Sequence, residues 1–250
     1  MYPYIHLGPL TLGTFGIFLA LGLLTALYVM QADFRRRRIE ADPYAIILWA
    51  GLAGIAGARL YHLLESPSEF FAHPWPMLFS RMGFAWFGGL LGGFLALTLA
   101  GRHYRIPFLT MMDVASPAAA LGYGIGRIGC LISGDGDYGI PTSLPWGMSF
   151  PNGIAPTAER VHPTPIYEFL AAVVIFYFLW RMGANAANGG LSRGKIFAIY
   201  LLLSGVARFL VEFIRVNPRS FFGMTNAQTV SLLCIVAGSV LLWRIRRIAA

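Results

Sequence analysis

The stretch PFLTMMDVASPAAALGYGIGRIGCLI, Pro107–Ile132, carries two charged residues, Asp113 and Arg127, in an otherwise apolar and small-residue run. A helix needs about 20 mostly apolar residues to cross a bilayer, and this run is longer than that. Gly124–Gly129 also matches G-x-G-x-x-G, which indicates a dinucleotide site only between a strand and a helix of a βαβ unit. No such alternation surrounds it, so the run predicts a membrane helix.

The composition of the whole chain supports the same class. Hydrophobic residues make up 57% of the 250 residues, charged residues 12%, and the mean hydropathy is +0.64. Soluble domains average about 25% charged residues, and a soluble protein of this size could not bury so much apolar surface. We therefore predict an all-α, polytopic integral membrane protein.

Seven apolar segments have the length of a membrane helix. We found no internal repeat, no hydrophilic extra domain and no pair of broken helices in corresponding halves, which argues against a transporter. The sequence predicts a single transmembrane domain, residues 1–250. The expected spans are Leu10–Met30, Pro43–Leu64, Leu78–Ala100, Pro107–Ile132, Pro165–Met182, Lys195–Ile214 and Asn226–Trp243.

The distribution of arginine and lysine predicts the orientation. Basic residues follow the first, third, fifth and seventh spans, while the intervening loops are poorer in positive charge, apart from Arg215 and Arg219. Because basic loops stay in the cytoplasm, the N-terminus is expected outside, the C-terminus inside, and residues 133–164 form a small extracytoplasmic segment. Topology and anionic lipid headgroups explain the net charge of +8, so no nucleic-acid partner is expected.

Four arginines are expected in the outer half of the membrane: Arg59, Arg127, Arg208 and Arg215. Arg208, Glu212 and Arg215 are spaced i, i+4, i+7, which would place them on one helix face. Snorkelling to headgroups, with an Arg208–Glu212 pair holding the bundle together, is one explanation. Because the four come from three helices, some in glycine-rich surroundings, we favour a shared site for an anionic phospholipid headgroup.

The cysteine and histidine residues predict neither a metal site nor a cofactor. Cys130 and Cys234 both lie in or beside apolar spans, which suits small buried residues better than a disulfide. No pair of histidines has a metal-site spacing, and no H-E-x-x-H motif occurs. We therefore expect no metal and no cofactor.

A family resemblance rests on several motifs that occur in order along the chain. The run GRIGCLISGDGDYG resembles the signature of the prolipoprotein diacylglyceryl transferases, G-R-x-G-N-F-x-N-x-E-x-x-G. The resemblance extends from about Thr11 to the end. The other motifs are GARLYH at 57–62, FGGLLGG at 87–93, DVASPAAALGYGIGR at 113–127, HPTPIYE at 162–168, ARFLVEFIR at 207–215 and NAQTVS at 226–231.

The resemblance implies a reaction and its partners. These enzymes transfer diacylglycerol from phosphatidylglycerol to the lipobox cysteine of a preprolipoprotein, forming a thioether and releasing glycerol phosphate. The expected location is the bacterial cytoplasmic (inner) membrane, crossed several times. Positioned guanidinium groups would stabilise the charge that grows on the departing phosphate. The expected partners are therefore phosphatidylglycerol, the preprolipoprotein signal peptide and membrane lipids.

The resemblance and the residue pattern together assign three groups of site residues. Arg127 and Arg208 take the essential arginine roles, Glu212 orients Arg208, and His62 is a substitute base. The lipid and phosphate site is expected to comprise Arg59, Arg127, Arg215, Gly88, Gly89, Gly126, Gly129, Ser133 and Gly139. The cavity residues are Asp113, Tyr167, Glu168 and Gln228.

Two departures from the family pattern leave an alternative open. The family has a histidine before Gly-Gly in the third span, the usual candidate base for the thiol, and this chain has Phe87. The signature asparagine is Cys130, and the acidic position is Asp135 or Asp137. A divergent transferase could use His62, or else His162, as its base. The alternative is a repurposed, non-catalytic relative that binds anionic phospholipid or a lipoprotein partner.

Overall fold

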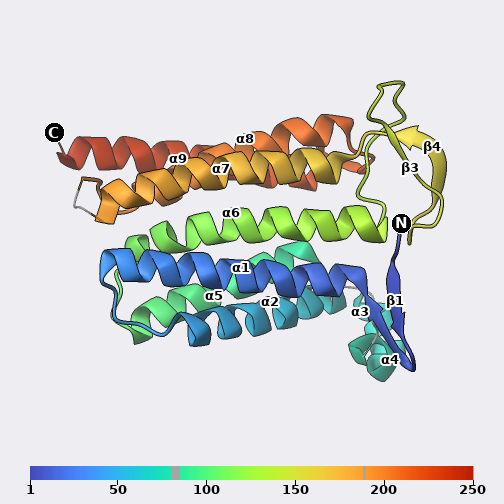
Figure 1. Ribbon diagram of the computed structural model, residues 1–250, viewed down its shortest axis with the longest axis horizontal. Helices are drawn as coiled ribbons and strands as arrows, with labels where there is room; N and C mark the ends of the chain where they lie inside the picture. The colour runs from blue at the N-terminus through green and yellow to red at the C-terminus, as the bar shows by residue number, and fades with distance from the viewer. Residues whose placement is uncertain (80–84, 188–189, 250) are drawn as a thin grey trace. The chain divides into compact units, whose positions relative to one another are not determined.

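The computed structural model describes residues 1–79, 85–187 and 190–249, and α-helices dominate this part of the chain (Figure 1). Five of the described helices are long and apolar enough to cross a membrane, namely α1, α2, α7, α8 with its extension to Ile214, and α9. This agrees with the predicted class of helical membrane protein. The helices are α1 (Thr14–Arg37), α2 (Pro43–Glu65), α3 (Pro67–Ala72), α4 (Pro74–Phe79), α5 (Trp86–His103), α6 (Phe108–Ser133), α7 (Thr164–Ala187), α8 (Lys195–Val211) and α9 (Asn226–Ala249).

Three small antiparallel hairpins accompany the helices, which the all-α prediction did not include. Residues at their turns, such as Gly8 and Gly223, have positive φ, a conformation that glycine adopts without strain. The strands pair β1 with β2, β3 with β4, and β5 with β6. Their bounds are β1 (Tyr4–Leu7), β2 (Leu10–Gly13), β3 (Met148–Phe150), β4 (Thr157–Val161), β5 (Arg219–Phe221) and β6 (Met224–Thr225).

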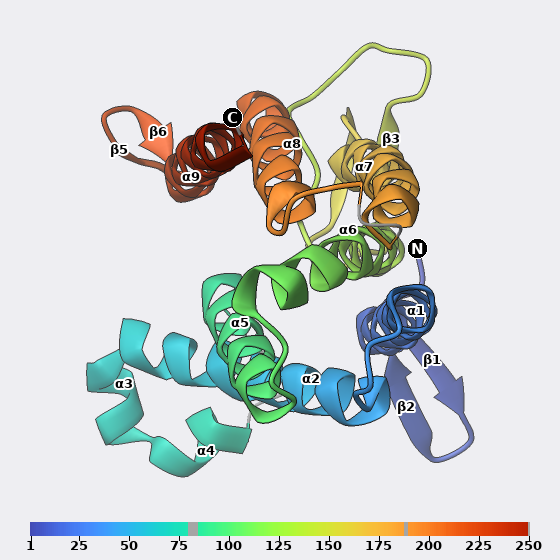
Figure 2. The ribbon, with the colours of Figure 1, turned by 90° about the vertical axis from the view of Figure 1, so that its left-hand side faces the viewer.

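The chain forms two compact units, which we describe separately. The first unit combines Met1–Arg37 with Met112–Ala250, and the second comprises Arg38–Met111. In the first unit, α7 packs on α8 and α8 on α9 (Figures 1 and 2). Its buried apolar cluster joins Ala120 of α6 to Leu179 of α7 and Ile196 of α8, so these three helices share one core.

A buried carboxylate fixes α6 to the start of α8 in the first unit. Asp113 Oδ2 accepts a hydrogen bond from the backbone N of Gly194 (2.6 Å), and Oδ1 accepts one from the backbone N of Phe197 (2.8 Å). The first amides of a helix have no partner within the helix and carry partial positive charge. An aspartate from another helix therefore caps α8, which explains how Asp113 is accommodated in an apolar span.

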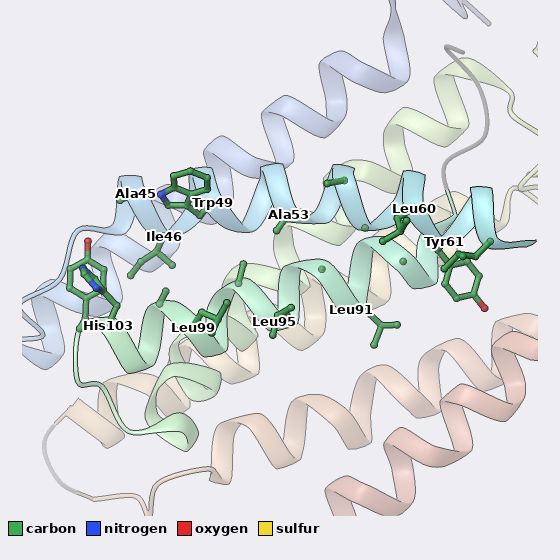
Figure 3. A pocket seen from close by; sticks show the side chains of 18 residues that line it. Ala45, Ile46, Trp49, Ala53, Leu60, Tyr61, Leu91, Leu95, Leu99 and His103 are labelled. Atoms are coloured by element: carbon green, nitrogen blue, oxygen red, sulfur yellow. The ribbon is translucent and has the colours of Figure 1, made fainter. Parts of the chain in front are cut away.

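The second unit is built on close contact between α2 and α5. A Cβ added to Gly57 would lie 2.4 Å from the carbonyl oxygen of Gly88, and one added to Gly92 would lie 2.1 Å from that of Ala53. Small residues let two membrane helices approach this closely. An apolar groove of about 830 Å³ follows the seam, with Trp49 and His103 toward one end and Tyr61 toward the other (Figure 3).

Two predicted boundaries differ from the structure. The first span was expected from Leu10, but residues up to Gly13 form a hairpin and α1 begins at Thr14. The third span was expected from Leu78, but Leu78 lies in the short helix α4 and α5 begins at Trp86. Residues 80–84 lie outside the described part of the chain. Proline residues begin both α3 and α4, where the first turn tolerates them, so apolar character alone misplaced this boundary.

Candidate functional site

Glu168, near the start of α7, lies at the centre of a buried ion-pair cluster in the first unit. Its Oε2 lies 2.7 Å from Arg127 Nη2 and 3.2 Å from Arg215 Nη1, and its Oε1 pairs with Arg208 Nη1. Tyr123 also donates its hydroxyl to Oε1, at 2.6 Å. One carboxylate thus contacts guanidinium groups from α6, from α8 and from the segment after α8.

Two further carboxylates complete the cluster. Asp137, in the loop after α6, places Oδ2 at 2.5 Å from Arg127 Nη1 and pairs through Oδ1 with Arg215 Nη2. Glu212 Oε2 lies 3.0 Å from Arg208 Nη2, and its Oε1 accepts from Asn217 Nδ2 at 2.5 Å. Three guanidinium groups are therefore ion-paired with three carboxylates, and the carboxyl group of Asp135 lies within 4.8 Å of that of Asp137.

Backbone contacts hold the loop of Asp137 against the end of α8. Ile140 N donates to the carbonyl of Ile214 (2.8 Å), and Thr164 Oγ1 donates to the carbonyl of Asp137 (2.5 Å). A Cβ on Gly139 would lie 2.4 Å from Ile214 O, so only glycine permits this approach. These contacts bring the signature loop, the start of α7 and Arg215 together.

Burial distinguishes two of the three arginines of this cluster from snorkelling side chains, whereas the side chain of Arg208 is 28% exposed. Arg127 and Arg215 are 8% and 9% exposed, so neither reaches freely into the surroundings of the first unit. The side chain of Asp137 is 34% exposed, whereas those of Glu168 and Glu212 are 4% and 0% exposed. Asp137 is therefore the one carboxylate of this cluster with direct access to solvent.

The guanidinium groups keep Asp137 ionised. Burial alone would raise the pKa of its carboxyl, but Arg127 and Arg215 outweigh that effect and lower the pKa to about 2. A lowered pKa means that ionised Asp137 stabilises the fold above the ordinary carboxyl value of 3.8. This contribution is lost as the pH falls from about 4 towards 2. The neighbouring Asp135 differs, because burial and then the charge of Asp137 raise its pKa.

The geometry of Arg215 corrects one prediction. The i, i+4, i+7 spacing placed Arg208, Glu212 and Arg215 on one helix face, but α8 ends at Val211 and Glu212–Ile214 forms a 3-10 turn. Arg215 then has extended backbone, φ −87° and ψ 153°. The three side chains still converge, because Arg215 Nε remains 3.7 Å from Glu212 Oε2.

Four predicted site residues belong to the second unit instead. Arg59 is buried on α2 and donates through Nε to the carbonyl of Leu78 (3.2 Å), and His62 is half-buried one turn later. Gly88 and Gly89 lie on the seam with α2, where Gly88 closely approaches Gly57. Both glycines thus have a packing role, and their predicted part in phosphate binding stays a prediction.

The remaining glycines and Ser133 of the predicted lipid site have different surroundings. A Cβ on Gly126, beside Arg127, would meet no atom within 4 Å, so there is open space at that position. A Cβ on Gly129 would lie 2.8 Å from Phe18 Cβ of α1, so this glycine allows two helices to touch. Ser133 is buried and donates to the carbonyl of Cys130 (3.2 Å).

Two of the predicted cavity residues make well-defined hydrogen bonds away from the arginines. Gln228 Oε1 accepts from Thr225 N and Thr225 Oγ1 accepts from Gln228 N, both at 3.1 Å, which is a capping box at the start of α9. Tyr167 accepts from Trp146 Nε1 (2.8 Å) and lies 3.2 Å from His162 Nδ1. His162 therefore lies in the same unit as the arginine cluster, held by Tyr167.

Three members of the cluster were not among the predicted site residues: Tyr123, Asp137 and Asn217. Tyr123 lies four residues before Arg127, a spacing that places both on one face of α6. Asp137 follows the signature arginine closely, but the extra residue in the signature left Asp135 and Asp137 equivalent. Asn217 carries no sequence signal that we can identify.

One group of side chains in the described residues has the spacing of a metal site, namely Cys130, Asp135 and Asp137. Arg127 Nη1, however, lies 3.3 Å from Cys130 Sγ and 2.5 Å from Asp137 Oδ2. A guanidinium group already lies where a cation would have to bind. Arg127 therefore competes with any cation for Cys130 and Asp137.

The arrangement can bind an anion in apolar surroundings. The buried Nε atoms of Arg127 and Arg215 have no hydrogen-bond partner in the described part of the chain. A buried donor without a partner costs about 1–3 kcal/mol, which a ligand oxygen would recover. Arginine forks match carboxylate and phosphate oxygens in pairs. The cluster thus contains arginine donors of the kind that bind a negative group.

Fold and site together define a helical membrane protein with a buried guanidinium–carboxylate centre that is suited to an anionic ligand. The chain belongs to the prolipoprotein diacylglyceryl transferase family, whose model matches residues 3–244.

Curated relatives carry the same description. A phosphatidylglycerol–prolipoprotein diacylglyceryl transferase of Leptospira interrogans serovar copenhageni is 31% identical over 249 residues, covering 86% of this chain and 77% of the relative. One from Clostridium tetani is 31% identical over 227 residues (90% and 89% covered). One from Nitrosospira multiformis is 33% identical over 263 residues (97% and 86% covered).

Proposed function

We propose that this chain transfers the diacylglyceryl group of phosphatidylglycerol to the lipobox cysteine of a preprolipoprotein. Family membership supports the reaction, and the cluster of Arg127, Arg208 and Arg215 around Glu168 is the observation that supports it chemically. We assign no cofactor and no metal to the reaction, which needs an activated thiol and a stabilised leaving group.

The bond changes explain why guanidinium groups are needed. The cysteine sulfur attacks a glycerol carbon of the lipid, a C–S bond forms, and the C–O bond to phosphate breaks. Glycerol phosphate leaves with one more negative charge, while the thiol proton passes to a base. Preorganised donors aimed at such developing charge contribute about 10²–10³ in rate each. We assign Arg127 and Arg208 to this role, with Glu212 orienting Arg208 through their 3.0 Å contact.

The base is a separate part of the proposal, because Phe87 cannot accept a proton. A free thiol has a pKa near 8.5, so roughly 3% of it is ionised at pH 7 without a base. His62 on α2 is the first candidate base. His162 is the second, and its place in the unit that holds the arginines supports it.

The proposal includes the arrangement in the membrane. We place seven spans in the bacterial cytoplasmic membrane, with the N-terminus outside, the C-terminus inside and residues 133–164 on the outer side. The whole chain would form one transmembrane domain. The helices found at the predicted positions and the alternation of basic loops support this arrangement.

The test is mass spectrometry of a lipobox peptide incubated with the purified protein and phosphatidylglycerol. We expect the peptide to gain the mass of a diacylglyceryl group, with glycerol phosphate released in equal amount. If phosphatidylglycerol binds but no thioether forms, the chain is a repurposed relative that binds anionic lipid. Glu168→Gln is the matched inactive variant, because it removes the carboxylate that contacts all three guanidinium groups.

A further inference from the structure

Asp137 has a position in the arginine cluster that a ligand phosphate could take. Its two carboxylate oxygens are divided between two guanidinium groups: Oδ2 lies 2.5 Å from Arg127 Nη1, and Oδ1 pairs with Arg215 Nη2. The two non-bridging oxygens of a phosphodiester would divide between the same donors in the same way. The side chain therefore resembles a bound anion that belongs to the protein itself.

The charge balance limits how a lipid phosphate can enter. Three ion-paired carboxylates already match the three guanidinium groups, and Asp135 adds a fourth carboxyl nearby, so an added phosphate would leave the cluster with net negative charge. A net charge in apolar surroundings is costly, because burial disfavours the charged form and screening is weak. If one carboxylate leaves as the phosphate arrives, the balance is kept.

Asp137 is the carboxylate best able to leave. Glu168 receives a hydrogen bond from Tyr123 and contacts three arginines, and Glu212 is held by Asn217 and Arg208. Asp137 instead lies in a loop between Gly134 and Gly139, and its side chain is 34% exposed. Both Gly134 and Gly136 have positive φ, so the loop makes a tight turn around this residue.

We propose that the phosphate group of the substrate displaces the Asp137 carboxylate from Arg127 and Arg215, so that Asp137 is a specificity-determining stand-in for the ligand. This inference rests on the proposed function for the identity of the lipid, but the exchange itself concerns the phosphate group. The Nε of Arg127, which has no hydrogen-bond partner in the described part of the chain, would then be available to a further ligand oxygen. The displaced carboxylate moves toward solvent, where water solvates its charge.

The test compares phosphate binding by the full-length protein with Asp137→Asn, measured by calorimetry in detergent. Dioleoyl phosphatidylglycerol, glycerol phosphate and inorganic phosphate are the three probes. An internal ligand that occupies the site lowers the apparent affinity for any competing ligand. We therefore expect the dissociation constants of Asp137→Asn for the probes to be at least about tenfold lower than those of the wild type. If Asp137→Asn binds only the lipid more tightly, the phosphate that displaces Asp137 is that of a membrane lipid. If it binds all three probes more tightly, the site recognises the phosphate group itself.

Two control variants separate displacement from other effects. Asp137→Glu keeps the charge and should bind close to wild type. Glu159→Gln removes the same charge from exposed strand β4 and should leave the dissociation constants unchanged. If Asp137→Asn binds the probes with unchanged or weaker affinity, or if Glu159→Gln strengthens binding equally, the inference is wrong. If the variant loses stability without a ligand, it is purified in phosphate, because bound ligand stabilises the folded state, and the phosphate is removed by dialysis before the titration.

Thioether formation, measured in parallel, separates this inference from the proposed function. Tighter phosphate binding by Asp137→Asn without any thioether in wild type would support the exchange and contradict the transferase. Thioether formation in wild type with no gain in affinity for Asp137→Asn would support the transferase and contradict the exchange.

Discussion

At the scale of single residues, Arg127 is the side chain whose shape matters most. Its two terminal nitrogens contact different carboxylates, Asp137 and Glu168, which a planar fork can do and a single ammonium cannot. We expect Arg127→Ala to lower the rate of thioether formation by more than about 10²-fold, and Arg127→Lys to restore little of it.

The control for this prediction is Arg219→Lys, which makes the same change at an exposed position on β5. It should leave the rate unchanged. Full activity of Arg127→Lys would mean that charge alone suffices, and it would contradict the role we give to the guanidinium fork.

Phe87 allows a second test at this scale. Its ring centroid lies 6.4 Å from that of Tyr61 and 5.4 Å from that of Trp86, in apolar surroundings on α5. Imidazole titrates at about pH 6.5. Phe87→His should therefore keep or raise the transfer rate and make that rate depend on pH between about 6 and 7. If His62 is the native base, adding His62→Ala should lower the transfer rate more in the wild-type protein than in the Phe87→His variant.

Phe94→His is the matched control for this pH profile. Phe94 lies on the same helix and packs edge-on against Phe108 at 5.9 Å. The same substitution there should add no step between pH 6 and 7. A step of equal size in both variants would show that the profile reports general perturbation of α5 and not a new base.

At the scale of elements, the seam between α2 and α5 depends on individual glycines. A Cβ on Gly92 would lie 2.1 Å from the carbonyl of Ala53, whereas one on Gly93 would meet nothing closer than 3.8 Å. We expect Gly92→Ala to destabilise the protein by about 1–3 kcal/mol through overpacking. Gly93→Ala should be neutral or stabilising, since alanine has the higher helix propensity. Thermal unfolding in detergent compares the two, and equal melting temperatures would contradict this account.

The elements also show how far sequence reasoning reaches. Long apolar runs predicted where the helices lie, because hydrophobicity over about 20 residues is a strong signal. The same reasoning missed the break after Val211, beyond which Arg215 pairs with Asp137 and with Glu168 of α7. Periodicity describes a continuous helix, so it cannot indicate where tertiary ion pairs end one.

The candidate site was predicted in part for a similar reason. Ionisable residues in apolar spans are rare enough to stand out, and Arg127, Glu168 and Arg208 were found in this way. Asp137 and Asn217 lie in loops, where polar residues are common and carry no such signal. Only the folded backbone, through the pairing of Ile140 with Ile214, brings Asp137 to the arginines.

At the scale of the whole molecule, the orientation in the membrane can be tested by labelling. Single cysteines at His103 and Glu159 lie in exposed positions of opposite predicted loops. In intact cells, an impermeant thiol reagent should modify the cysteine at Glu159 and not the one at His103. The native Cys130 is buried and is kept. Cys234 is half-buried, so it is replaced by alanine to remove background labelling. Labelling at 103 but not at 159 would reverse the proposed topology.

The cap that Asp113 provides for α8 has a consequence for how the protein is made. The carboxylate and the amides of Gly194 and Phe197 are about eighty residues apart in the chain, so α6 emerges from the ribosome well before α8. The amides of Gly194 and Phe197 therefore gain this partner only when α8 docks beside α6. The cap is therefore a long-range contact that can form only after the whole stretch from α6 to the first turn of α8 has been synthesised.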